Sequence, residues 1–315
     1  MNTGEARFVK SRSADWGELE VLLESTQRRR LRAGEAWQLS RLFRSICADV
    51  SHARGQGFSA ARVAYLDTLA ARSHRVLYFR PATRFGGLLQ WLLRGFPREV
   101  RASGWFIAVA SALLWLPFLF TLIGTLISPT FGTVFVDAGT LQQASESYAT
   151  SIVRSGSENA FMSGFYVYNN VGIAFRCFAV GVIPGLGPAW YLVFNGTQMG
   201  TTFGWVMREG FGHNIWAFVC GHGFLELTAI AVSGAAGLRL GWTLVRPGPF
   251  SRAEALQREA VPLATLIAGA GFMLGVAAMI EGWWSAADVS HGVKAAVGIA
   301  NTCATLLWLW WGGRR

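Results

Sequence analysis

Residues 220–237 read CGHGFLELTAIAVSGAAG, and this stretch decides the fold class of the chain. It is mostly apolar but contains two ionisable residues, His222 and Glu226, whose four-residue spacing places them on one face of a helix. An ionisable side chain at the centre of a membrane span costs about 2.5 to 3.5 kcal/mol, so it is retained where it has a partner, a cavity or a function. His222 and Glu226 are therefore the first candidate site residues.

The composition of the whole chain is typical of a membrane protein. Hydrophobic residues make up 52% and charged residues 15% of its 315 residues, and the apolar residues come in long blocks. A helix needs about 20 apolar residues to cross about 30 Å of hydrocarbon. We therefore expect an all-α, polytopic membrane helix bundle. The blocks near this length predict about six transmembrane helices, at 104–127, 161–183, 189–207, 214–242, 262–280 and 293–311.

Basic residues in the connections predict the orientation, because loops rich in Lys and Arg stay on the cytoplasmic side. Of the 28 Lys and Arg residues, 23 lie in residues 1–103, in the 243–261 loop or at the C-terminus. The opposite side holds three, which are Arg154, Arg208 and Lys294. Both termini are therefore expected in the cytoplasm.

The N-terminal region predicts a separate cytoplasmic domain, residues 1–83. It contains three segments with helical spacing of apolar residues, which begin near Ser13, Gly34 and Ser59. Residues 84–103 alternate apolar and basic groups, as an amphipathic helix in the headgroup layer does. The transmembrane bundle then occupies residues 104–315. Its external loop, 128–160, is expected to form one short helix that caps the bundle or contacts a partner.

A basic cluster in the first domain bears on the choice of partners. It consists of Arg28, Arg29, Arg30 and Arg32. Basic faces beside a membrane gain about 1 kcal/mol per residue from anionic lipids. No nucleic-acid-binding motif accompanies the cluster. We therefore expect membrane lipids as partners and no nucleic acid.

Glycines at four-residue intervals predict close packing between helices, because such faces let two backbones approach in lipid. The third predicted span contains Gly196, Gly200 and Gly204, and the fifth contains Gly271 and Gly275. These faces serve contacts within one bundle or between two copies. Packing within one chain and a homodimer (a homo-oligomer) therefore both stay open.

Polar residues within the predicted spans gather in the second, third and fourth spans. Arg176 and Glu226 are the only opposite charges in the apolar runs that are able to meet, and pairing offsets much of the desolvation of both. The predicted intramembrane polar site consists of Glu226, His222, Arg176, Asn170, Asn169 and Asn195. Two interpretations stay open, a structural network and a path for a substrate or for protons.

The fourth predicted span, 214–242, is too long for an untilted crossing. Gly221 and Gly223 flank His222 within it, so the helix is either tilted or broken at Gly-His-Gly. A break frees backbone groups and places the N-terminus of a half-helix beside His222, an arrangement that transporters use to hold ions.

The sequence does not favour an enzyme, a cofactor or a metal site. His213 is the only further histidine near His222 and no H-E-x-x-H order occurs, so a metal would need ligands from other spans. No catalytic constellation with usable spacing is present. The four cysteines show no C-x-x-C spacing and indicate no disulfide framework. We therefore expect no catalytic residue, no metal and no cofactor.

Four motifs carry a resemblance to a known family. They are NNVGIAFRCFAVGVIPGLG at 169–187, FNGTQMG at 194–200, HGFLEL at 222–227 and GAAGLRLG at 234–241. In order and spacing they resemble the stage II sporulation protein M family over about residues 84–312. The chain departs from that family at Gly221, where a proline often precedes the histidine.

The resemblance implies a multi-pass protein of the bacterial cytoplasmic (inner) membrane. The resemblance carries over to these positions: Asn170, Asn195, Gly196, His222, Glu226, Gly234 and Gly237. Of these, Gly234 and Gly237 are expected to serve helix packing. The family name comes from a membrane protein of spore formers that anchors peptidoglycan-degrading partners. By analogy, the resemblance implies a non-enzymatic scaffold or anchor for envelope-associated partners. The alternative is a transporter, channel or lipid translocator with a polar path at Glu226 and His222.

Overall fold

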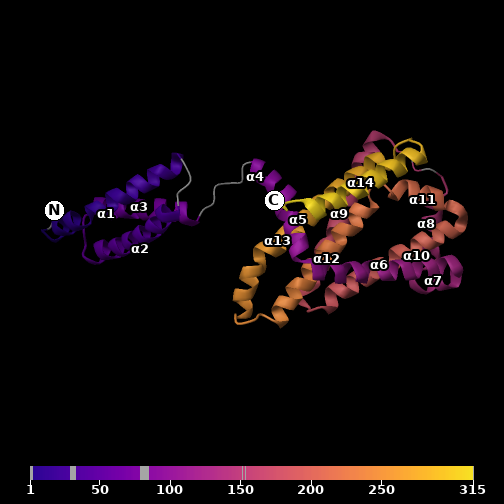
Figure 1. The fold of residues 1–315 in the computed structure, drawn as a ribbon, viewed down its shortest axis with the longest axis horizontal. Coiled ribbons are helices and arrows are strands. Elements are labelled where there is room, and N and C mark those ends of the chain that lie inside the picture. The colour runs from indigo at the N-terminus through magenta and orange to yellow at the C-terminus, as the bar shows by residue number, and fades with distance from the viewer. Residues whose placement is uncertain (1–2, 29–32, 79–84, 151, 153, 315) are drawn as a thin grey trace. The chain divides into compact units, whose positions relative to one another are not determined.

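The computed structural model describes residues 3–28, 33–78, 85–150, 152 and 154–314. Within these residues the chain is helical and contains no strand, which confirms the all-α fold class (Figure 1). The chain divides into two compact units, Met1–Gly86 and Gly87–Arg315. Arg29, Arg30 and Arg32 of the basic cluster, and Arg84, lie outside the described residues.

The first unit is a three-helix domain with its own core. It contains α1 (Thr3–Arg28), α2 (Ala33–Gly55) and α3 (Ala60–Tyr78). Leu19, Leu39 and Leu66, one from each helix, are at most 1% exposed. Burying such a side chain contributes about 1.5 to 3 kcal/mol, so a shared apolar core holds the three helices together.

The first helix begins at Thr3, whereas the sequence predicts its start near Ser13. The additional turns are held by tertiary contacts that a local pattern does not reveal. Phe8 packs against Phe58, with ring centroids 5.4 Å apart, and the Glu5 carboxylate accepts a hydrogen bond of 2.8 Å from the Ser59 hydroxyl. Both contacts join the start of α1 to the start of α3.

The segment that precedes the bundle is helical and contains one π-helical turn. It comprises α4 (Phe85–Gln90), the π-helical turn η1 (Trp91–Gly95) and α5 (Phe96–Ala102). Pro97 lies in the first turn of α5, directly after the π turn, and has no N–H to donate; the Leu92 carbonyl accepts a hydrogen bond of 3.2 Å from the Trp308 indole. Phe96 is fully buried against Gly269 and Trp308, so this segment packs into the bundle at its end.

The second unit is a helix bundle around one central helix, α12 (Gly223–Val245). Its other long helices are α6 (Gly104–Ile127), α9 (Gly156–Ala179), α10 (Leu186–Val206), α13 (Arg252–Met279) and α14 (His291–Trp311). All residues of α12 from Ala229 to Gly237 are buried. This run of Ala, Gly and other small side chains allows α6, α9, α10 and α13 to approach α12 from several sides.

Four helical segments in the described residues are long and apolar enough to cross a membrane: Gly104–Ile127, Gly223–Val245, Arg252–Trp284 and His291–Trp311. The two other predicted spans, 161–183 and 189–207, correspond to α9 and α10, which are helical but less apolar. Asn169, Asn170 and Arg176 lie in α9, and Asn195 and Gln198 lie in α10. The count of six crossings is therefore not confirmed, and for α9 and α10 it stays a prediction.

The two predicted glycine faces differ in the structure. A Cβ at Gly196, Gly200 or Gly204 would collide with the backbone carbonyls of Leu114, Phe118 and Leu122, so α10 lies directly on α6. A Cβ at Gly271 or Gly275 would meet nothing within 4 Å. Close packing within the chain therefore explains the face on α10, whereas the face on α13 is open.

The loop after α6, which is predicted to be external, contains two helices, α7 (Pro129–Phe135) and α8 (Ala138–Tyr148), where the sequence predicts one. Asp137 caps α8 by accepting a hydrogen bond from the Thr140 amide. Leu141 is fully buried, and the Tyr148 carbonyl accepts a hydrogen bond of 2.8 Å from the Asn214 amide side chain. The loop is thereby attached to the bundle beside the start of α12.

Candidate functional site

The fourth predicted span is broken at Gly-His-Gly. It follows the π-helical turn η3 (Met207–Phe211) and consists of α11 (Gly212–Val219), a turn at Cys220–His222, and α12. The Gly221 carbonyl, which the break leaves without a helical partner, accepts a hydrogen bond of 2.9 Å from the Asn301 side chain of α14. A Cβ at Gly298 would collide with the Cys220 carbonyl, so α14 lies directly against the turn. The break is therefore stabilised by a neighbouring helix, as backbone within a membrane requires.

Three ionisable side chains meet where α12 begins. His222 is the N-cap residue of α12 and Glu226 lies one turn further, while Glu281 comes from the π-helical turn η4 (Ile280–Trp284) that follows α13. His222 Nε2 lies 3.9 Å from Glu226 Oε2 and 3.9 Å from Glu281 Oε1. The side chains are 3%, 14% and 11% exposed. We call His222, Glu226 and Glu281 the His–Glu–Glu cluster.

The second ring nitrogen of His222 also has a hydrogen-bond partner. His222 Nδ1 lies 3.0 Å from the Ser285 hydroxyl oxygen. Ser285 is positioned in turn, because its amide donates to the Ile280 carbonyl at 2.9 Å and its carbonyl accepts from Lys294 Nζ at 2.8 Å. The bond from Ser285 to Ile280 closes the π turn, a type of helical irregularity that often occurs at functional sites.

Aromatic residues from α8 and α11 cover the cluster. The Phe218 ring packs edge-on against His222, with centroids 5.8 Å apart, and Tyr148 of α8 packs against Phe218 at 6.0 Å. Burial raises the pKa of the Tyr148 hydroxyl above its ordinary value, and the nearby Glu281 carboxylate raises it further. Arg154 donates to the Tyr166 hydroxyl at 3.2 Å and lies over the Phe218 ring.

The structure unites only part of the predicted polar site. His222 and Glu226 lie together, but Arg176 is exposed on α9, and no ion pair joins it to Glu226 in the part of the chain that the structure describes. Asn169 donates to Asn170 at 2.9 Å, and Asn195 donates to the Tyr191 carbonyl of its own helix. The predicted ion pair between Arg176 and Glu226 is therefore wrong. Glu226 faces Glu281 and His222 instead.

Sequence reasoning missed Glu281 and Ser285. The fifth predicted span ends at Ile280, so Glu281 counts there as a loop residue, but the helical segment continues to Trp284. The available signal is the position of this glutamate, between a long apolar run and Trp283-Trp284. An acidic residue in such a place is a candidate for the end of a membrane span rather than for a loop.

The other end of α12 holds a second pair of glutamates. Arg239 donates to Glu99 of α5 at 2.5 Å and pairs with Glu259 of α13 at 2.7 Å, and it also bonds the Ser103 hydroxyl. The sequence allows Arg239 to extend alone toward the interface, but it joins three helices. Here the permanent positive charge lies between the two carboxylates.

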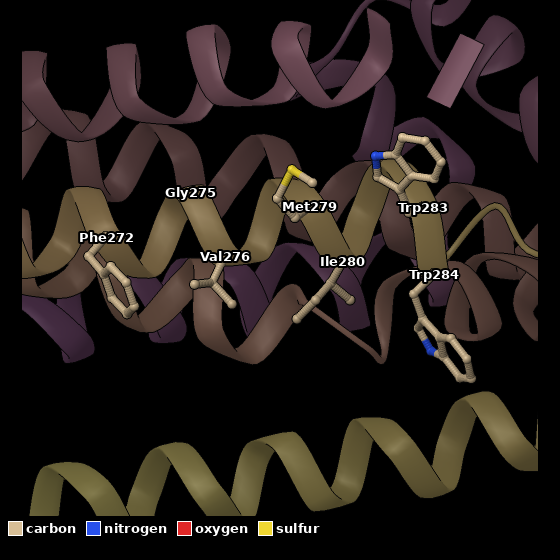
Figure 2. A pocket seen from close by; sticks show the side chains of 7 residues that line it. All are labelled: Phe272, Gly275, Val276, Met279, Ile280, Trp283 and Trp284. Atoms are coloured by element: carbon tan, nitrogen blue, oxygen red, sulfur yellow. The ribbon is translucent and has the colours of Figure 1, made fainter. Parts of the chain in front are cut away.

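An open apolar groove of about 490 Å³ runs along α13 and η4. Figure 2 shows Phe272, Val276, Ile280 and Trp284 pointing to one side of the helix and Met279 and Trp283 to the other. Gly275 leaves space between these two rows. The groove suits lipid acyl chains, and its lining contains none of the three cluster residues.

The comparison with protein families decides the identity of the bundle. Residues 106–286, more than half of the chain, match the family described as Stage II sporulation protein M. The chain belongs to the stage II sporulation protein M family. Residues 6–79 match a family described as a domain of unknown function (DUF8413). No curated protein and no solved structure matches the chain.

The family match covers the whole His–Glu–Glu cluster. It begins in α6 and ends one residue after Ser285, so His222, Glu226 and Glu281 belong to the part that is shared with the stage II sporulation protein M family. α14, which supplies Asn301, lies beyond the match. With its family and its apolar helices, the chain is a membrane protein.

Proposed function

We propose that this stage II sporulation protein M family member is a non-enzymatic scaffold of the bacterial cytoplasmic membrane. The observation that carries the proposal is the division of the chain into two compact units, each with its own core. One unit belongs to the stage II sporulation protein M family, and the other has a separate match to a domain of unknown function. Such a chain is suited to holding a cytoplasmic partner and envelope partners at one place in the membrane.

The tight packing of the bundle favours this role over transport. α10 lies on α6 backbone to backbone, and the His–Glu–Glu cluster is nearly buried beneath aromatic side chains. Packed cores of this kind do not deform gradually, whereas alternating access needs one part to rock against another. The distribution of basic residues supports cytoplasmic positions for both termini.

Exposed apolar side chains on the first unit offer a contact for a partner. Trp37 on α2 is 69% exposed and Val21 on α1 is 68% exposed. Tryptophan is enriched among the residues that contribute most to binding. The open face at Gly271 and Gly275 offers a second contact, either for another envelope protein or for a second copy of the chain.

The test is complementation of a strain that lacks the protein, combined with photo-crosslinking at position 37. We expect Trp37→Ala to lose complementation although the protein is inserted and folded. Arg44→Ala, an exposed position on the same helix, serves as the control and should complement. Glu226→Gln should also complement if it folds. If Glu226→Gln abolishes function while every crosslinked partner is retained, the scaffold is the wrong function.

The transporter alternative has one specific observation in its favour. The described residues pair neither Glu226 nor Glu281 with an arginine or a lysine, although both lie near the end of membrane-spanning helices. Ionisable groups of this kind often mark ion pathways. Vesicles that contain the purified protein test it, because flux that depends on Glu226 would support transport.

A further inference from the structure

The geometry of the His–Glu–Glu cluster is that of a set of ligands rather than of a hydrogen-bonded network. One ligand atom from each of His222, Glu226 and Glu281 lies within 4.8 Å of the other two. The distances of 3.9 Å from His222 Nε2 to the two carboxylates are too long for hydrogen bonds. Glu281 is 8% exposed, and its Oε2 atom is buried without a hydrogen-bond partner.

Within the described residues, no ion pair joins a lysine or arginine to either carboxylate of the cluster, and Arg154 acts on Glu281 as a more distant charge. Two carboxylates lie together in an apolar bundle, where an uncompensated charge is costly. The hydrogen bonds of two basic groups go to other partners, because Lys294 donates to the Ser285 carbonyl and Arg154 donates to the Tyr166 hydroxyl. A positive charge between the carboxylates would therefore stabilise this end of α12, as Arg239 does at the other end.

The contact with Ser285 holds the His222 ring in an orientation in which its Nε2 atom is able to bind a cation. When Nδ1–H donates to the Ser285 hydroxyl, the lone pair of Nε2 points toward the two carboxylates. Metal-binding histidines generally donate their second ring N–H to such an acceptor, which fixes the tautomer and the orientation of the ring. The backbone of Ser285 is itself held by the π turn and by Lys294, which fixes the position of the hydroxyl, so this support is part of the fold.

We propose that His222 Nε2 and the carboxylates of Glu226 and Glu281 bind one divalent transition-metal ion of the zinc class. A site with one nitrogen and two carboxylate ligands favours zinc, manganese or iron over calcium and magnesium, which prefer oxygen ligands alone. Zinc with bonds of about 2.0 to 2.1 Å brings tetrahedral ligands to about 3.3 Å from one another, so the three groups need only close in slightly. A fourth position is left for water.

The ion would act as a cross-link within the bundle. It would join the first turn of α12 to the π turn η4 and neutralise both glutamates, while the break at Gly221 supplies the N-terminal end of a helix for the carboxylates. The proposal does not depend on the scaffold function. Metal content and partner retention are measured separately, so either proposal is able to fail alone.

The test uses the full chain, purified without chelator and placed in lipid nanodiscs, then dialysed against zinc at trace concentration. We expect about one zinc ion per chain by elemental analysis, with X-ray absorption showing a nitrogen and oxygen shell. Glu281→Gln and His222→Gln should each lose the ion. Glu209→Gln, an exposed glutamate on η3, is the matched control and should retain it.

Two further variants keep the test decisive. His213 and His291 lie with ring centroids 5.7 Å apart on the surface and are another place where zinc would collect, so the double variant His213→Ala/His291→Ala should retain the bound ion. Ser285→Ala keeps all three ligands and should weaken zinc affinity about 10- to 100-fold, as the loss of a supporting hydrogen bond does. This variant replaces Glu281→Gln if that one does not fold.

Three results would overturn the proposal. The first is a chain that binds no zinc, manganese or iron after loading. The second is zinc that persists in Glu281→Gln but disappears in the His213/His291 double variant, which would assign it to the surface. The third is an infrared band of a protonated carboxyl in the zinc-treated protein that Glu281→Gln removes, since a shared proton would then fill the role of the ion.

Discussion

The two ends of α12 hold similar groups but balance their charge differently. At the Arg239 end, a guanidinium lies 2.5 and 2.7 Å from two glutamates that belong to α5 and α13. At the His222 end, an imidazole lies 3.9 Å from two glutamates, and its second nitrogen is taken by Ser285. At the Arg239 end, each charged group has a partner within the chain. The other end has no lysine or arginine paired with its glutamates in the described residues, and it is the site that we propose for a cation.

This difference separates a structural ion pair from a candidate functional site. Burial alone does not distinguish them, because the side chains at both ends are less than 30% exposed. What distinguishes them is whether each charge has a partner at bonding distance. Variants at the two ends should therefore change stability in different ways.

The largest effect is expected from Arg239→Met. It leaves Glu99 and Glu259 facing each other, and breaking a fully buried pair costs about 3 to 5 kcal/mol. Because the three side chains are 17%, 22% and 28% exposed, water offsets part of this cost. We expect a loss of about 2 to 3 kcal/mol in the free energy of unfolding. Denaturant unfolding of the purified chain in detergent measures it.

The control for this prediction removes the charges that the arginine balances. Arg239→Met combined with Glu99→Gln and Glu259→Gln should regain most of the lost stability, because no unpaired carboxylate then remains. If the triple variant is as unstable as Arg239→Met alone, the packing of the arginine rather than its charge holds this end together.

The next largest effect is expected at the break, from Asn301→Ala. It leaves the Gly221 carbonyl without its partner, and an unsatisfied buried polar group costs about 1 to 3 kcal/mol. Hydrogen exchange in residues 219–223 should become faster. Asn195→Ala is the matched control, since Asn195 donates to a carbonyl of its own helix and its loss leaves the turn unchanged. Equal exchange in both variants would contradict the role of Asn301.

A third prediction compares one glutamate from each end in the presence of a chelator. Glu99→Gln weakens a charged hydrogen bond to Arg239 and should cost about 1 to 2 kcal/mol. Glu281→Gln removes one of two neighbouring carboxylates and should leave the stability unchanged or raise it by about 1 kcal/mol. Thermal unfolding of both variants checks this opposite sign. A clear loss of stability in Glu281→Gln under chelator would mean that the chain supplies the balancing charge itself.

The smallest effect concerns Glu5, a carboxylate with complete partners in the first unit. The hydrogen bonds from the Ser59 hydroxyl and amide hold the pKa of Glu5 below its ordinary value of 4.5. Since the pKa is lower in the folded than in the unfolded chain, this contribution to stability is present at neutral pH. It is lost as the pH falls below 4.5 toward the folded value.

Glu5→Gln should therefore reduce the acid sensitivity of the first unit. Hydrogen exchange within α1, followed between pH 6 and pH 3 in the full chain, measures it locally. Glu24→Gln is the control, because Glu24 lies exposed on the same helix. An unchanged acid dependence in Glu5→Gln would show that its contacts with Ser59 contribute little to stability.

The parts of the fold that the sequence predicts are those with local causes. His222 and Glu226 are neighbours through their spacing on one helix, and the close packing at Gly200 follows from a repeat within one helix. Glu281 reaches the same site only through the register of α13 against α12, which no local pattern contains. Arg176 was matched to Glu226 by charge alone, and the rotation of α9 places it on the outside.

The family resemblance drawn from the motifs is confirmed, and so is the all-α fold class. The start of α1 and the helix α7 were missed, because Phe8 and Phe131 are fixed by contacts with other segments. The scaffold function, the orientation and the homodimer stay predictions. They depend on partners and on a membrane, and a single sequence describes neither.

The π turn at Ile280–Trp284 has a consequence for how the chain tolerates insertions and deletions. Glu281 is its second residue and Ser285 directly follows the turn, and the two side chains approach different nitrogens of one imidazole ring. In an α-helix, one residue more or fewer rotates everything beyond it by about 100°. A deletion of one residue between them would shift Ser285 from Nδ1 while leaving Glu281 in place. The geometry of the site therefore depends on the number of residues in this turn as well as on their types.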